Sequence, residues 1–251
     1  MIRGLYTSAS GMLTEMVRND VTSNNLANVN TTGYKKDTAL FKSFPELLVQ
    51  RVNDQKKTDV NERPVIGSMG TGAIVDEVVT SHEQGALRET SNPFDLAVAG
   101  EGYFVVQNQQ GTYYTRNGSF TVDGQGFLVT TQGAYVLGQA GPIKIGNSNN
   151  VVVDGSGNVN VDGNRIATMR LVNILNKATL TKVGDSLFTG GQAGAGAVGQ
   201  IKQRFVEGSN VNPITEMVNM IAIARAYEAN QKMITAHDQT LAQAMEVGTL
   251  R

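Results

Sequence analysis

The longest regular hydrophobic pattern in the sequence lies near the C-terminus, in residues 210–241. Apolar side chains that recur there at intervals of seven are Met220, Tyr227, Ile234 and Leu241. This spacing forms one stripe along an amphipathic α-helix, and the opposite face is charged. Pro213 fits the first helical position, where a missing N–H leaves nothing unpaired. The pattern predicts a helix of about 30 residues, whose stripe is too long for one small domain to cover.

A second stripe of the same kind begins at the N-terminus. Its members, at steps of three and four, are Ile2, Leu5, Ala9, Met12 and Met16. The pattern predicts a helix from about Ile2 to Ala27, which ends in a segment rich in Asn, Thr and Gly. Two heptad-like helices at the two ends of one chain predict a coiled-coil layer, with everything else looped between them. An ordinary long core helix is the alternative.

Between Ala73 and Val206 the hydrophobic period changes from 3.6 to 2. Strands are expected at residues 94–99, 102–106, 113–122, 127–130, 134–137, 143–145, 151–153, 159–161, 166–173 and 200–205. Short strands separated by turns are typical of an all-β domain, sandwich- or barrel-like and rich in hairpins. Asn117-Gly118 is the strongest hairpin signal. The similar segments 122–126 and 153–157 predict two hairpin corners of one kind.

The predicted fold class is therefore α+β, with long N- and C-terminal helices around a central all-β domain. Residues 1–34 and 208–251 form the helical terminal domain, residues 73–207 the β domain, and residues 35–72 a linker or arm. Within this arm, a short helix or extended segment near residues 45–51 precedes a polar linker. A solvated loop is the default expectation for the linker, and an arm that orders on contact with a neighbouring copy is the alternative.

Composition and charge exclude several kinds of partner. The net charge is −1 and the pI about 6.1, which gives no electrostatic footprint for nucleic acid or an anionic membrane. There is no cysteine, so the chain has no disulfide and no thiolate metal site. No apolar run approaches the roughly 20 residues that span a bilayer. The N-terminus also lacks the apolar segment of a secretory signal. We expect no nucleic-acid partner, no membrane insertion and no cleaved signal peptide.

The sequence offers little for catalysis. His82 and His237 are the only histidines, and each is expected to be a packed or surface residue, since no second ligand or nucleophile lies near it in sequence. The motif G-x-S-x-G is absent. Asp123 and Asp154 lack the alternating acidic residues of a calcium loop, so turn formation explains them better. We expect no catalytic, cofactor or metal site, and therefore no enzyme.

Several motifs resemble those of one known family. They are NNLANV at residues 24–29, TGYK at residues 32–35, EGSNVN at residues 207–212, RAYEAN at residues 225–230, and the central segments PFDLAVAGEGYF and YTRNGSF. These motifs resemble the axial proteins of the bacterial flagellum, the rod and hook family. The resemblance covers nearly the whole chain, and the paired motifs at the two ends are specific.

The resemblance implies a structural subunit that polymerises helically into a torque-transmitting tube in the basal body, within the cell envelope. The terminal helices would line the export channel and the β domain would lie outside them. The partners implied are other copies of the chain, neighbouring rod and hook subunits, and the flagellar type III export apparatus. The long extra domains of hook subunits are absent, which favours a rod protein. Its position, proximal or distal, stays open.

The polymerisation interface expected from the resemblance and the stripes consists of Leu5, Met12, Met16, Asn24, Asn25, Leu26, Ala27, Asn28, Asn210, Val211, Met217, Met220, Ile223, Tyr227, Ile234 and Leu241. A hook-type axial subunit is an alternative within the same class. A carbohydrate-binding β module is an alternative from another class, with Tyr103, Tyr113, Tyr114 and Tyr135 as the candidates for stacking on sugars. A wall-cleaving enzyme is a third.

Overall fold

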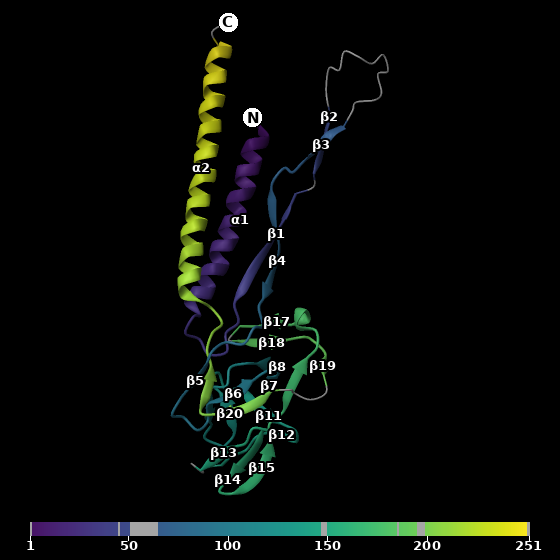
Figure 1. Ribbon diagram of the computed structural model, residues 1–251, viewed down its shortest axis with the longest axis vertical. Coiled ribbons are helices and arrows are strands. Elements are labelled where there is room, and N and C mark those ends of the chain that lie inside the picture. The colour runs from purple at the N-terminus through teal and green to yellow at the C-terminus, as the bar shows by residue number, and fades with distance from the viewer. Residues whose placement is uncertain are drawn as a thin grey trace. The chain divides into compact units, whose positions relative to one another are not determined.

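The computed structural model describes residues 2–44, 46–50, 65–146, 150–184, 186–194 and 199–249 (Figure 1). The chain forms two compact units. Unit 1 consists of Met1–Asn24, Asp37–Val79 and Ile214–Arg251. Unit 2 consists of Asn25–Lys36 and Thr80–Pro213. Each unit is therefore assembled from segments that lie far apart in the sequence.

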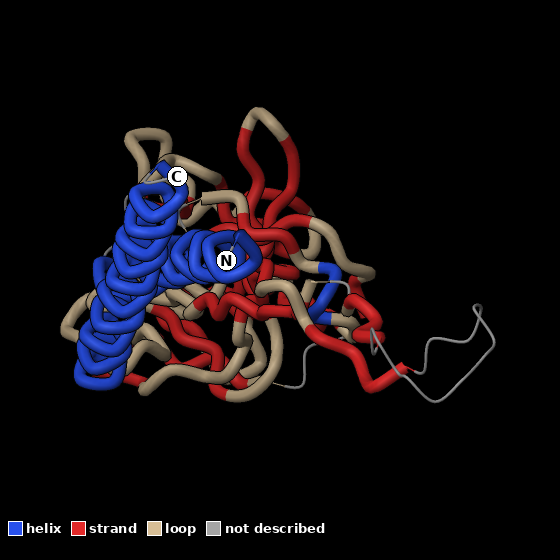
Figure 2. The backbone as a smooth tube through the Cα atoms, turned by 90° about the horizontal axis from the view of Figure 1, so that it is seen from above, coloured by secondary structure: helices blue, strands red, loops and turns tan. Residues whose placement is uncertain are grey.

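Two helices dominate unit 1: α1 (Ile2–Ala27) and α2 (Pro213–Thr249). They run side by side in opposite directions (Figures 1 and 2). A Cβ atom placed on Gly4 would lie 2.5 Å from Nε2 of His237, and one on Gly11 would lie 3.0 Å from Nδ2 of Asn230. A step of seven residues forward along α1, from Gly4 to Gly11, corresponds to a step of seven residues backward along α2, so both contacts fit one antiparallel register. The predicted helices are thus present, and Pro213 is the first residue of α2 as expected.

The predicted coiled-coil layer is wrong. The part of the chain that the structure describes has one long helix near each end, and the remainder is mostly β. Where the two helices face one another, Gly4 and Gly11 lie against His237 and Asn230. A coiled coil needs apolar knobs at these positions, and glycine has no side chain to supply one. Tyr227, a member of the predicted stripe, is 38% exposed. At Gly4 and Gly11 the helices therefore meet through small and polar side chains.

A narrow β ribbon completes unit 1. Strand β1 (Asp37–Ser43) pairs with β4 (Ala73–Thr80), and β2 (Leu47–Gln50) pairs with β3 (Val65–Met69). Part of the arm expected near residues 45–51 is thus strand β2; Pro45 and residues 51–64, which hold most of the polar linker, lie outside the described residues. Each sheet has only two strands, and every residue of β3 is exposed. Isolated two-stranded sheets are marginally stable in water.

Unit 2 is built from short strands. Ten of them form one sheet, in the order β17-β18-β8-β7-β11-β10-β9 with β12, β16 and β19 attached; β13, β14 and β15 form a second sheet, and β20 pairs with β6 and β21 with β5. The bounds are β5 Leu87–Glu89, β6 Leu96–Ala99, β7 Tyr103–Asn108, β8 Gly111–Thr115, β9 Phe120–Val122, β10 Leu128–Thr130, β11 Tyr135–Gly138, β12 Gly141–Pro142, β13 Val151–Val153, β14 Asn158–Val161, β15 Asn164–Thr168, β16 Leu171–Ile174, β17 Thr181–Lys182, β18 Leu187–Thr189, β19 Ala193–Gly194, β20 Gln200–Gln203 and β21 Phe205–Glu207, with a 3-10 helix at Lys177–Thr179.

The core of unit 2 lies on both faces of strand β7. Phe104 and Val106 point into the larger hydrophobic cluster, where Phe104 meets Phe120 edge to face with ring centroids 5.2 Å apart. Tyr103 and Val105 point to the opposite face and a smaller cluster. Successive side chains of a strand alternate between its faces. This double burial explains why residues 103–106 of β7 form an unbroken apolar run.

The two predicted hairpin corners are confirmed. In the turn between β9 and β10, Oδ1 of Asp123 accepts hydrogen bonds from backbone N–H groups two and four residues later, at 2.9 and 2.7 Å. Oδ1 of Asp154 does the same between β13 and β14, with both distances 2.9 Å. Gly126 and Gly157 both adopt φ of 85°. An aspartate that mimics backbone acceptors and a glycine that tolerates positive φ make this turn.

The hairpin predicted at Asn117-Gly118 is wrong. Strand β8 pairs with β7 and β18, and β9 pairs with β10, so the dipeptide joins two strands that do not pair. A Cβ atom on Gly118 would lie 1.5 Å from the carbonyl oxygen of Leu96. Asn117 instead accepts the hydroxyl of Thr32 at 2.7 Å. The glycine permits a close approach of two backbones, and the asparagine holds a distant segment of the chain.

Candidate functional site

Unit 1 presents a large apolar surface. Among its described residues, Ile223 is the only hydrophobic side chain that is buried. We define the apolar surface of unit 1 by its exposed large hydrophobic residues: Tyr6, Leu13, Met16, Leu40, Phe41, Phe44, Leu47, Leu48, Val65, Ile66, Met69, Ile74, Val78, Val79, Ile214, Met217, Val218, Ile221, Tyr227, Met233, Met245 and Val247. Exposed apolar surface on this scale marks a site of interaction.

The structure distributes the residues expected at the polymerisation interface over both units. Exposed are Met16, Asn24, Ala27, Met217 and Tyr227; half-buried are Leu5, Met12, Leu26, Asn28, Asn210, Met220, Ile234 and Leu241; buried are Asn25, Val211 and Ile223. Oδ1 of the buried Asn25 accepts the hydroxyl of Tyr34 at 3.1 Å. Oδ1 of Asn210 accepts the backbone N–H of Lys36 at 2.7 Å, and its amide donates to the carbonyl of Ser81 at 3.0 Å. Both asparagines therefore hold unit 2 together.

Three hydroxyl groups of α1 attach the β ribbon to the helix. Thr7 and Thr14 donate hydrogen bonds to the carbonyl groups of Thr71 and Ala73, at 3.1 and 3.2 Å. Ser10 accepts the N–H of Ala73 at 3.4 Å. Spacings of three and four residues place these hydroxyls on one side of the helix. This polar stripe lies beside the apolar one, and the hydrophobic periodicity of the sequence does not reveal it.

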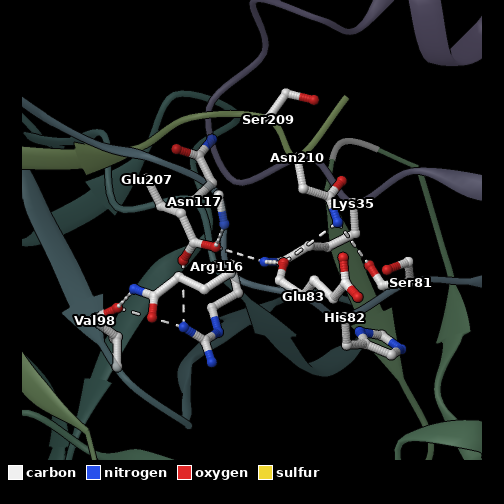
Figure 3. Close-up of polar contacts among 12 residues, drawn as sticks. Lys35, Ser81, His82, Glu83, Val98, Arg116, Asn117, Glu207, Ser209 and Asn210 are labelled. Carbon is white, nitrogen blue, oxygen red and sulfur yellow. Dashed lines mark hydrogen bonds and ion pairs between the residues drawn. The ribbon is translucent and has the colours of Figure 1, made fainter. Parts of the chain in front are cut away.

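A cluster of buried charges lies in unit 2 (Figure 3). Oε1 of Glu207 is 2.5 Å from Nζ of Lys35, and its Oε2 is 3.3 Å from Nη1 of Arg116. The side chains of Lys35, Arg116 and Glu207 are 1%, 4% and 0% exposed. Lys35 also donates to the carbonyl of Glu83 at 2.5 Å. One carboxylate thus balances two buried cations, and the three residues come from three distant parts of the sequence.

Backbone contacts reinforce this charge cluster. The N–H of Gly33 donates to the carbonyl of Glu207 at 2.8 Å, and the N–H of Gly85 donates to its carboxylate at 3.0 Å. Gly33 has φ of 68°, and a Cβ atom on it would lie 2.3 Å from the backbone nitrogen of Asn117. Only glycine fits such a position without strain. The segments that follow α1 and precede α2 are therefore joined inside unit 2.

Burial shifts the pKa values of groups around the cluster. Burial lowers the pKa of Lys35, and the nearby carboxylate of Glu207 opposes this shift. The pKa of His82 falls to about 4, first through burial and then through the positive charge of Lys35 and other cations. Burial raises the pKa of Tyr103 to about 12. The Tyr103 hydroxyl lies 2.9 Å from Nδ1 of His82, so the two neutral side chains form a hydrogen bond.

Sequence reasoning assigned no role to Lys35, Arg116 or Glu207. Each lies in a motif that carried the family resemblance, namely TGYK, YTRNGSF and EGSNVN. Isolated charged residues normally lie on the surface, and nothing in the local pattern distinguishes these three. Their pairing depends on contacts between distant segments, which the sequence alone does not display.

The tyrosines considered for sugar binding lie apart from one another. Tyr103 and Tyr114 contribute to the smaller hydrophobic cluster and Tyr113 to the larger, whereas Tyr135 is 37% exposed and packs against Phe127. They do not form one surface on which a sugar could stack. Within the described ranges, no three His, Cys, Asp or Glu side chains gather as metal ligands would. None of the described helices has the length and apolar character to cross a membrane.

Three family models match the sequence. "Flagella basal body rod protein" matches residues 5–35, "Flagellar hook protein FlgE/F/G D1 domain" residues 97–161, and "Flagellar basal body rod FlgEFG protein C-terminal" residues 202–247. The first and last of these contain Lys35 and Glu207, the two ends of the shortest contact in the charge cluster. All three models describe structural parts of the bacterial flagellum, and none describes an enzyme.

Comparison with individual proteins defines the family more precisely. The flagellar basal-body rod protein FlgG of Caulobacter vibrioides is 34% identical over 256 residues, which cover 96% of this chain and 97% of that protein. FlgG of Bacillus subtilis is 33% identical, covering 98% and 99%. The rod protein FlgF of Caulobacter vibrioides is 34% identical, covering 93% of each. The chain belongs to the family of flagellar basal-body rod proteins, which are structural subunits.

Proposed function

We propose that this rod subunit self-assembles through unit 1, whose apolar surface neighbouring subunits cover as the rod grows. The observation that carries the proposal is the contrast between the units: Ile223 is the only buried hydrophobic side chain among the described residues of unit 1, whereas unit 2 has a complete core. Burying a large hydrophobic side chain contributes about 1.5 to 3 kcal/mol. Contacts with other subunits would supply the burial that unit 1 lacks.

The proposed assembly is a helical tube. Helices α1 and α2 line it around the export channel and transmit torque, while the self-contained unit 2 forms the outer part. The β ribbon of unit 1 supports this, because two-stranded sheets with exposed apolar faces need a covering surface. The exposed members of the expected interface, such as Met16, Met217 and Tyr227, are part of the surface that the tube would bury.

The subunit reaches the cell envelope, in this proposal, as an unfolded chain that the flagellar type III export apparatus transports without a cleaved signal peptide. The absence of cysteine supports transport in this form, because no disulfide has to be broken before the chain can unfold. Assembly then completes folding. Helices in proteins gain most of their stability from packing of their apolar face, and neighbouring subunits would provide that packing for α1 and α2.

The test of assembly compares two apolar-to-charged substitutions. Ile221→Asp changes a residue of unit 1 that is 55% exposed, and Leu175→Asp changes one of unit 2 that is 82% exposed. We expect the wild-type protein and Leu175→Asp to form rod-like particles when concentrated, as seen by electron microscopy. Ile221→Asp should raise the concentration needed for assembly at least tenfold, with the cooperative unfolding of unit 2 unchanged. Assembly by Ile221→Asp at the wild-type concentration would refute the proposal.

A further inference from the structure

Helix α2 extends beyond its partner helix. Gly4 packs against His237, and α1 begins two residues before Gly4. The antiparallel register therefore leaves residues 240–249 of α2 without α1 beside them, and Figure 1 shows this end of α2 beyond the start of α1. We call this segment the overhang; it is about 15 Å long at 1.5 Å per residue. Met245 and Val247 within it are 72% and 73% exposed.

An apolar groove lies on another side of α1, where the helix faces the β ribbon. Its volume is about 650 Å³. The helix contributes Arg3, Tyr6, Leu13 and Val17 among others, at spacings of three to seven residues, and Phe44 is one of the ribbon residues that line it. Of the described residues that line the groove, Arg3 is the only charged one. The groove belongs to unit 1 alone, and it runs along α1 for about 20 Å, at least the length of the overhang.

We propose that the groove binds the overhang of a second copy of this chain. This inference rests on the proposed function, since it names one contact by which rod subunits join. The chemistry of the two surfaces is complementary. Both are mainly apolar, and Glu246, the one charged residue in the sequence of the overhang, would meet Arg3, the one charged residue among the described residues of the groove. Burial of Met245, which shares one side of the helix with Leu241 four residues earlier, would supply much of the free energy.

The occupant has to come from another molecule. The overhang continues a helix that packs against the start of α1 at Gly4, and it extends away from that point. Reaching the groove of the same molecule would require α2 to break and reverse its direction. A contact between two different surfaces is heterologous, so each molecule can bind one neighbour with its groove and another with its overhang. Such a contact can repeat from one copy to the next, as a helical rod requires.

The first test measures the contact directly with a labelled synthetic peptide of residues 238–251. Fluorescence anisotropy should show saturable binding of this peptide to the full chain. Leu13→Glu, which places a charge in the groove at a residue that is 63% exposed, should weaken binding at least tenfold. A peptide with Met245→Glu should lose affinity to the same extent. Met233→Glu in the full chain is the matched control, because Met233 lies on the part of α2 alongside α1, and it should bind as the wild type does.

The second test exchanges the two charges. Arg3→Glu in the protein and Glu246→Arg in the peptide should each weaken binding several-fold, and the two together should restore most of the affinity. Absence of saturable binding, equal binding by Leu13→Glu, or no recovery in the charge exchange would each overturn the inference. Binding that is lost equally in Met233→Glu would also overturn it, because it would place the contact elsewhere.

Assembly of the whole protein separates this inference from the proposed function. If the wild-type protein forms rods and both Leu13→Glu and Met245→Glu form them equally well, the groove is not the contact, but unit 1 can still assemble by other surfaces. If Ile221→Asp assembles like the wild type, the proposed function itself fails. Where the inference holds, a mixture of Leu13→Glu and Met245→Glu should yield one-to-one dimers in sedimentation, and neither variant alone should do so.

Discussion

At the scale of single residues, Glu207 is the side chain on which unit 2 depends most. Among the described residues, it is the only carboxylate that forms an ion pair with the buried Lys35 and Arg116. We expect Glu207→Gln to lower the free energy of unfolding of unit 2 by about 3 to 5 kcal/mol, because the substitution leaves two buried cations without a counter-charge. The chain has no tryptophan, so urea denaturation followed by circular dichroism and tyrosine fluorescence is the appropriate measurement.

An exposed ion pair provides the control for Glu207. Oε1 of Glu101 lies 2.9 Å from Nζ of Lys177, and the Glu101 side chain is 57% exposed. Exposed ion pairs contribute little, so Glu101→Gln should leave the urea midpoint of unit 2 nearly unchanged. Equal losses for the two substitutions would contradict the central role of the buried cluster.

His82 makes the stability of unit 2 depend on pH. Its pKa is about 4 in the folded state and 6.5 in the unfolded chain. As the pH falls below 6.5, His82 binds a proton in the unfolded chain but not in the folded protein. The free energy of unfolding therefore decreases from about pH 6.5 to about pH 4. Above pH 6.5 His82 is neutral in both states and contributes no pH dependence. We expect a loss on the order of 2 kcal/mol between pH 7 and pH 5. His82→Gln should remove that part of the pH dependence.

The pH dependence should survive in Tyr103→Phe. This variant deletes the hydroxyl that bonds to Nδ1 of His82 but keeps the ring and the burial. Because burial is the largest cause of the pKa shift, the slope between pH 7 and pH 5 should persist, with the stability lowered at every pH. A slope lost in Tyr103→Phe as fully as in His82→Gln would assign the shift to the hydrogen bond instead.

At the scale of elements, the register of α1 and α2 can be tested with disulfides, since the natural chain has no cysteine. A Cβ atom on Gly11 would lie 3.4 Å from Cγ of Asn230, which is close enough for a disulfide between cysteines at the two positions. We expect Gly11→Cys/Asn230→Cys to oxidise within one molecule. Gly11→Cys/His237→Cys, displaced by two helical turns, should remain reduced. Both proteins are compared by non-reducing electrophoresis of dilute samples.

Elements could be predicted where the signal is local. The period of the hydrophobic pattern gave α1 and α2, and an aspartate followed three residues later by glycine gave the corners at Asp123 and Asp154. Prediction failed where distant contacts decide: Gly118 looks like a hairpin glycine but makes room for the backbone of Leu96. The coiled coil failed for a similar reason. Heptad spacing identifies an apolar stripe, but it does not say which side of α1 the partner helix occupies.

At the scale of the whole molecule, the sequence predicted that the terminal helices carry apolar stripes too long for one small domain. The structure adds that most of the exposed large hydrophobic residues belong to unit 1, including those of the β ribbon. The buried cluster of Lys35, Arg116 and Glu207 could not be predicted, because it depends on three segments that meet only in the folded domain. Each of these residues lies in a motif that carried the family resemblance, namely TGYK, YTRNGSF and EGSNVN.

Limited proteolysis of the isolated subunit tests the division into two units. Unit 1 buries little apolar side-chain surface, so its backbone should open locally and be cut first, whereas residues 80–213 should resist. Residues 25–36 should also be retained after cleavage on both sides, because the Lys35–Glu207 ion pair and the Gly33 hydrogen bond hold them in unit 2. Native mass spectrometry should therefore detect a two-chain core. In Glu207→Gln the chain of residues 25–36 should dissociate from this core. If the terminal helices of the wild-type protein resist the protease as well as unit 2 does, the proposed need for neighbouring subunits is contradicted.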